Sequence, residues 1–125
     1  MIVERKKTDW DSYYKKRSLI SSSTQKITQK QICKYMKRYI ETPENLEILE
    51  LGGANSCFFD FIVRTFAPKK YAIIDNSQYG LDKFKENCNQ NSCDILLINE
   101  DILKIDKTTE KFDFTYSIGL IEHFD

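Results

Sequence analysis

The spacing of hydrophobic residues changes near residue 45. Before that position apolar residues recur at helical intervals, which predicts a short helix over about residues 9–19, capped by Asp9 or Asp11, and a second over about 24–40. After it, short apolar runs at 46–51, 71–75, 95–98 and 112–118 alternate with helical patterns at about 55–66 and 78–87. Strands that alternate with helices of this length predict parallel βαβ units.

Ligands of such sheets bind beyond the carboxyl ends of the strands. In this chain four stretches fall there, and each holds acids, amides or glycines where apolar residues would pack better: Glu50–Ser56, Asp75 with Asn76, Asn99–Ile102 and Ser117–Glu122. The sequence therefore predicts a ligand site made from these four loops.

The residues in these loops suit a nucleoside-bearing cofactor. Gly52 and Gly53 let the backbone approach a ligand closely, although two glycines also suit a plain strand-to-helix turn. Asp75 stands at the end of the second strand, where an acid accepts hydrogen bonds from a ribose diol or else caps the next helix. Asp101 could accept from an exocyclic amine of adenine, and Glu50 could orient an ammonium group or hold the loop.

The glycine turn does not follow the dinucleotide pattern G-x-G-x-x-G, because Ala54 and Cys57 stand at its second and third glycine positions. An acid at the start of the glycine turn favours a cofactor with a positively charged amino-acid end. The run Glu50-Leu51-Gly52-Gly53-Ala54-Asn55-Ser56 resembles the first motif of the class I S-adenosylmethionine-dependent methyltransferases, with Ala54 and Ser56 where that family often has glycines.

Three further segments resemble that family in the same order along the chain. Asp75 matches its acid at the end of strand two, Asp101-Ile102 its adenine-contacting pair, and 112–124 its segment around strand four. The resemblance implies an α/β fold: a Rossmann-like three-layer sandwich, here a partial parallel sheet in strand order 3-2-1-4 behind an N-terminal helical lead-in. It also implies S-adenosyl-L-methionine as cofactor, bound by Glu50, Gly52, Gly53, Asn55, Asp75, Asn76, Asp101, Ile102 and Ser117.

The family's sheet continues beyond strand four, whereas this chain ends at Asp125. We therefore expect a fragment of a longer enzyme, or a natural half-domain whose strand-four edge is covered by a partner or by a second copy. The expected domains are a helical segment, 1–45, and a partial cofactor-binding domain, 46–125. The methyl acceptor is not indicated, and Glu122 and His123 are the candidates for acid–base catalysis.

Composition narrows the range of partners. The 125 residues are 41% hydrophobic and carry 19 basic and 19 acidic side chains, so no net charge favours nucleic acid. The lysines of the 24–40 helix are interpreted as a solvated face in preference to a nucleic-acid patch. With neither a membrane-spanning run nor a signal peptide, the expected compartment is the cytoplasm. The four cysteines are expected to be free thiols, and no metal site is predicted.

The alternative to a methyltransferase is a noncatalytic protein that binds a partner through the strand-four edge or the basic helix.

Overall fold

The computed structural model describes residues 9–16, 22–41, 44–54, 58–89, 92–105 and 111–118. Four helices alternate with or precede the strands: α1 (Trp10–Lys16), α2 (Ser22–Tyr39), α3 (Phe59–Phe66) and α4 (Gln78–Asn87). The strands are β1 (Glu47–Leu51), β2 (Lys70–Asp75), β3 (Asp94–Asn99) and β4 (Phe114–Ser117), and a short 3₁₀ helix, η1 (Ile102–Lys104), follows β3.

The four strands form one parallel sheet in the order β3-β2-β1-β4. In its register Glu50 of β1 lies between Ile73 of β2 and Tyr116 of β4, and Asp75 lies beside Asn99 of β3. The α/β, Rossmann-like fold with a helical lead-in and strand order 3-2-1-4 is therefore confirmed.

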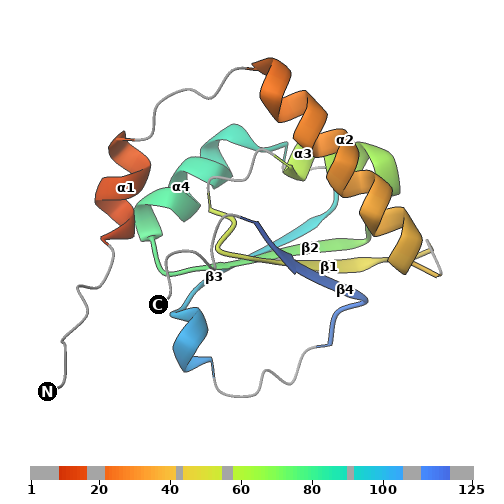
Figure 1. Ribbon diagram of the computed structural model, residues 1–125. Coiled ribbons are helices and arrows are strands. Elements are labelled where there is room, and N and C mark those ends of the chain that lie inside the picture. The colour runs from red at the N-terminus through yellow and green to blue at the C-terminus, as the bar shows by residue number, and fades with distance from the viewer. Residues whose placement is uncertain are drawn as a thin grey trace, which may run out of the picture.

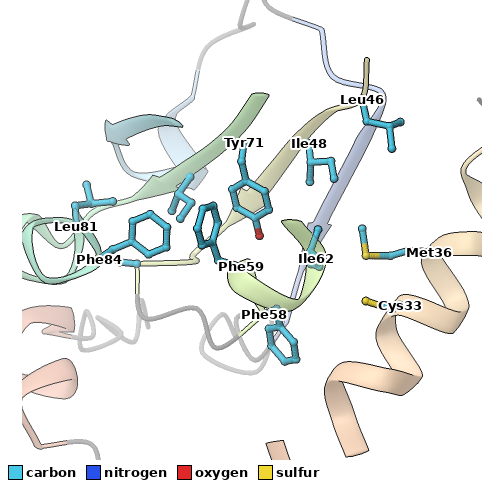
Figure 2. Packing of buried hydrophobic residues seen from close by; sticks show 12 residues of the cluster. Cys33, Met36, Leu46, Ile48, Phe58, Phe59, Ile62, Tyr71, Leu81 and Phe84 are labelled. Carbon is cyan, nitrogen blue, oxygen red and sulfur yellow. The ribbon is translucent and has the colours of Figure 1, made fainter. Parts of the chain in front are cut away.

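Helices α1 to α4 lie on one side of the sheet, as Figure 1 shows. Side chains of alternate strand residues point toward them and form the main core, in which Tyr71 and Phe59 meet edge to face with ring centroids 4.9 Å apart (Figure 2). The alternation arises because successive strand residues face opposite sides of a sheet. The buried members drawn and labelled in Figure 2 are Cys33, Met36, Leu46, Ile48, Phe58, Phe59, Ile62, Tyr71, Leu81 and Phe84.

The other side of the sheet carries a smaller core. Leu49, Ala72 and Ile74 are buried there, and η1 brings Ile102 against them, on the side of the sheet away from the helices in Figure 1. Phe112 joins this cluster from just before β4, with the Lys70 ammonium 5.7 Å from its ring centroid. The predicted fourth strand was therefore too long at its start, because Phe112 packs as a loop residue.

The ends of the helices follow from local capping. Asp9 caps α1, since its carboxylate accepts from the Ser12 amide at 3.2 Å and from the Ser12 hydroxyl at 2.7 Å. Helix α3 ends where Ala67 takes a left-handed conformation with φ 44°, and Pro68 follows it. Helix α1 is described as far as Lys16, and the predicted limit near residue 19 lies outside the described residues.

The apolar stripe predicted for the second helix is only partly buried. Cys33 and Met36 are 5% and 2% exposed in the core. Ile27, Tyr35 and Tyr39 are instead 61%, 58% and 67% exposed, because α2 meets the rest of the protein along a narrower face than its apolar residues span. Among the described helices, none is both long and apolar enough to cross a membrane.

Candidate functional site

The turn after β1 is shaped by its two glycines in different ways. Gly52 has φ 71°, a left-handed conformation that favours glycine, and its amide donates to the Ile74 carbonyl at 2.7 Å. Gly53 lies against Glu50, so that a Cβ at this position would be 2.5 Å from the carboxyl carbon of that residue. The turn therefore needs glycine first for its backbone angle and then for space.

Glu50 points beneath this turn, into the side of the sheet that the helices cover. Its side chain is 3% exposed, and its Oε2 accepts from the Tyr71 hydroxyl at 2.5 Å and the Tyr116 hydroxyl at 2.8 Å. The two tyrosine hydroxyls also contact each other. One carboxyl group thus connects the three adjacent strands β2, β1 and β4.

The Tyr71 hydroxyl is held in its neutral form by this environment. Burial, followed by the nearby Glu50 carboxylate and Tyr116, raises the pKa of Tyr71 well above its usual value. A neutral hydroxyl can donate to Glu50, so the shift and the hydrogen bond support the same arrangement. At neutral pH Tyr71 is a hydrogen-bond donor in the core.

Asp75 holds the loops beyond β1 and β2. It is 3% exposed, and its two carboxylate oxygens accept different backbone amides: Oδ2 accepts from Ala54 at 3.1 Å and Oδ1 from Ser77 at 2.9 Å. The first amide belongs to the glycine turn and the second to the start of α4. Asp75 therefore fixes two of the four loops relative to each other.

Ser77 connects this region to the N-terminal lead-in. Its hydroxyl oxygen accepts from the Gly80 amide at 3.0 Å as the N-cap of α4, and its hydroxyl donates to Asp11 of α1. The Lys15 ammonium of α1 lies 5.0 Å from the ring centroid of Tyr79. Helix α1 is thereby placed beside the carboxyl end of β2, next to the start of α4.

The loop after β3 supplies the third part of the candidate site. Asp101 is half-buried, and its carboxylate accepts from the Leu103 amide at 3.0 Å as the cap of η1. The side-chain amide of Asn99 donates to the side-chain carbonyl oxygen of Gln78 at 2.9 Å. The backbone amide of Glu100 donates to the backbone carbonyl of Asp75 at 3.1 Å. These bonds join the end of β3 to the end of β2 and the start of α4.

The structure brings most of the predicted site residues to one edge of the sheet. Glu50 and Asp75 lie in the last two residues of β1 and β2, and Ser117 ends β4. Gly52, Gly53, Asn76 and Asp101 follow the ends of β1, β2 and β3, with Ile102 in η1. Asn55, Glu122 and His123 lie outside the described residues. The roles predicted for these residues in binding a cofactor stay predictions.

Sequence reasoning missed two side chains that contact the predicted site residue Glu50, and one that contacts Ser77 beside the site. Tyr116 lies directly beside Glu50 in the register, and Tyr71 lies diagonally, beside Ile48. Both tyrosines occupy positions that face the same side of the sheet as Glu50, so strand alternation carried a signal for them. Nothing in the sequence pattern indicated that Asp11 would reach Ser77.

A cavity of about 380 Å³ lies away from this edge, between the end of α4 and the first half of β3. Its lining is Lys85, Cys88, Cys93, Asp94, Ile95 and Leu97. Cys88 and Cys93 are free thiols, and burial raises the pKa of each. Within the described residues no group of three or more histidine, cysteine or acidic side chains could hold a metal ion.

Comparison of this chain with known proteins supports its fold but does not assign it to a family. No family model matches the chain, and no curated protein matches its sequence. Among the solved structures that match, one chain does so with a TM-score of 0.58 and 12% identity, from a complex between the Haloferax volcanii Trm112 methyltransferase activator and the protein assigned as a methyltransferase. The alignment covers 87% of this chain and 46% of that chain, so this protein spans about half its length.

Proposed function

We propose that this chain is the cofactor-binding part of an S-adenosylmethionine-dependent methyltransferase. The observation that carries the proposal is the glycine turn after β1, which the carboxylate of Asp75 ties to the start of α4 through the Ala54 and Ser77 amides. This turn stands at the carboxyl end of a central strand of a parallel sheet, where ligands of such folds bind. Likeness to a structure that includes an assigned methyltransferase supports the same reading.

The donors and acceptors at this edge fit the parts of such a cofactor. The turn at Gly52 offers backbone close to a ligand, and Asp101 offers a half-buried carboxylate for an amine. Glu50 and Asp75 are 3% exposed and bonded within the protein, so we assign them first to positioning the turn. A direct contact of Asp75 with a ribose diol and of Glu50 with an ammonium group remains part of the proposal.

The cofactor, when bound, supplies a methyl group on a sulfonium that a heteroatom of the acceptor can attack in line. The contribution of this chain is position: the Gly52 turn and the loop with Asp101 would orient the two ends of the bound molecule. Helix α1 lies beside the start of α4, where the Ser77 hydroxyl donates a hydrogen bond to Asp11. In this position the helix would close this edge of the sheet to water.

Calorimetric titration of the full chain with S-adenosylhomocysteine tests the proposal. We expect saturable heat that is lost in Gly52→Val, because valine disfavours the left-handed conformation at that position. We also expect Asp101→Asn to weaken binding several-fold, by about 1 kcal/mol, through the lost charge on an amine contact.

The matched control is Asp60→Asn, at an exposed position of α3 that is not one of the predicted site residues. It removes the same charge and should leave the affinity unchanged. If the folded wild-type chain gives no heat at high ligand concentration, or if Asp60→Asn weakens binding as much as Asp101→Asn, the proposed cofactor site is wrong.

A second candidate function is a noncatalytic partner-binding role through strand β4. Within the described part of the sheet, β4 pairs only with β1, so its other edge carries backbone groups that another strand could pair with. The similar solved structure is itself a complex of an activator with its partner, which supports assembly as a property to test in this chain.

Substitution of an outward-facing residue of β4 distinguishes this role. The Thr115 side chain is exposed. Thr115→Pro removes the backbone N–H donor at this position of β4, and we expect it to abolish pairing of another strand with the open edge. Analytical ultracentrifugation should then show a loss of association compared with Thr115→Ser. A wild-type chain that is monomeric at every concentration would remove support for self-association, and cofactor binding would still be measurable.

A further inference from the structure

The outer face of α2 combines positive charge with exposed aromatic rings. The helix Ser22–Tyr39 contains five basic residues and no acidic one, although the whole chain has no net charge. All five basic side chains are exposed: Lys26, Lys30, Lys34, Lys37 and Arg38. Among the described residues, none of the five forms an ion pair, so the positive charge of this helix is not neutralised by a neighbouring carboxylate.

Two tyrosine rings stand among these cations. Tyr35 and Tyr39 are 58% and 67% exposed, one helical turn apart, and the Arg38 guanidinium lies 5.8 Å from the centre of the Tyr35 ring. More than half of each ring is exposed, whereas the apolar side chains Cys33 and Met36 of the same helix are buried in the core. The rings are therefore available to a partner while the helix stays anchored.

We propose that this face of α2, defined by Lys30, Lys34, Tyr35, Arg38 and Tyr39, binds single-stranded nucleic acid. Phosphates would contact the cations, which extend over about 12 Å from Lys30 to Arg38, and unpaired bases would stack on the two tyrosine rings. The combination of a basic surface with accessible aromatic rings is what sequence-tolerant single-strand binding requires.

The zero net charge of the chain is compatible with this interaction, because phosphates respond to the local field. At physiological salt the screening length is about 8 Å, so acidic residues on distant surfaces contribute little at α2. An anionic membrane is the weaker match. Cys33 and Met36 of α2 are buried in the core, and Ile27 is the one large aliphatic side chain of the described helix that is exposed, so little aliphatic surface is left to enter the lipid.

Fluorescence anisotropy with labelled single strands of RNA and DNA, each about 12 nucleotides long, tests the proposal at about 50 mM salt. We expect Lys30→Gln/Lys34→Gln/Arg38→Gln to weaken binding and to reduce the salt dependence, with a change of about 2 in the slope of log K against log salt concentration. We expect Tyr35→Ala/Tyr39→Ala to weaken binding by about tenfold per ring and Tyr35→Phe/Tyr39→Phe to retain it, because phenylalanine keeps the stacking surface.

The matched control removes three exposed cations elsewhere, in Lys69→Gln/Lys104→Gln/Lys111→Gln. It changes the net charge by the same amount and should leave the affinity unchanged, while circular dichroism verifies that each variant is folded. Absence of binding by folded wild type at low salt would overturn the proposal, as would an equal loss in this control. Binding to phosphatidylserine vesicles with none to nucleic acid would also overturn it and indicate a lipid surface.

This surface is independent of the proposed cofactor site. The α2 variants should bind S-adenosylhomocysteine as wild type does, and Gly52→Val should bind nucleic acid as wild type does. Loss of S-adenosylhomocysteine binding and loss of nucleic-acid binding therefore report on the two proposals separately.

Discussion

Two buried acids stand at the ends of neighbouring strands and do different work. Glu50 and Asp75 are each 3% exposed and face the helix-covered side of the sheet. Glu50 is bonded by side-chain hydroxyls of the adjacent strands, both at one oxygen. Asp75 is bonded by backbone amides of the loops that follow, one at each oxygen. The first acid ties strands together, and the second sets the shape of the candidate site.

The largest effect is expected from Asp75→Ala. The buried amides of Ala54 and Ser77 would lose their acceptor, and each unsatisfied donor costs about 1–3 kcal/mol, so the free energy of unfolding should fall by about 2–6 kcal/mol. Urea denaturation measures the loss. Hydrogen exchange should show faster exchange at these two amides, and this readout separates loop release from general destabilisation.

The control for this comparison is Asp60→Ala, which removes an exposed acid from the first turn of α3. It should cost less than about 1 kcal/mol, since only a helix-dipole contribution is lost. If the two alanine variants were equally stable, Asp75 would not be the residue that holds the loops.

The next largest effect is expected from Gly53→Ala. The added Cβ would lie 2.5 Å from the Glu50 carboxyl carbon and 2.6 Å from its Cγ, so side chain or turn must move. Overpacking of this kind costs about 1–3 kcal/mol. In a Glu50→Ala background those atoms are absent, and Gly53→Ala should then cost little. Additive losses in this double-mutant cycle would show that Glu50 is not the reason for the glycine.

A smaller effect is expected from Glu50→Gln. Both tyrosine hydroxyls bond to Oε2, so the carbonyl oxygen of glutamine in that place would keep both bonds, and the cost should be under about 1 kcal/mol. Asp75→Asn should cost more, because its two oxygens serve different amides and one would face an NH₂ group instead. Urea denaturation of the two variants compares them directly, and the reverse order of stabilities would contradict the assigned roles.

The sequence predicted the part of this arrangement that depends on local pattern. The four strands, their order and the placement of Asp75 at the end of β2 follow from apolar periodicity, βα alternation and the resemblance to the methyltransferase family. The partners of Glu50 depend on register, since Tyr116 meets it only because β4 pairs with β1 at that residue. The exposure of Tyr35 was equally hidden, because an amphipathic ring serves a core or a surface and its spacing alone does not distinguish them.

The smallest effect concerns pH and isolates the Glu50 side of the comparison. The pKa of Tyr71 is raised above the value of about 10 expected in the unfolded chain, so the folded protein keeps a proton that the unfolded chain releases. The stabilisation is full below pH 10 and is lost as pH rises toward the folded pKa. Wild type should lose about 0.8 kcal/mol by about pH 10.5 through this group, and Tyr71→Phe should not. The Asp75→Asn variant, which leaves Tyr71 intact, should keep the wild-type slope. Parallel pH profiles for wild type and Tyr71→Phe in urea denaturation would show that the hydroxyl on Glu50 does not titrate with unfolding.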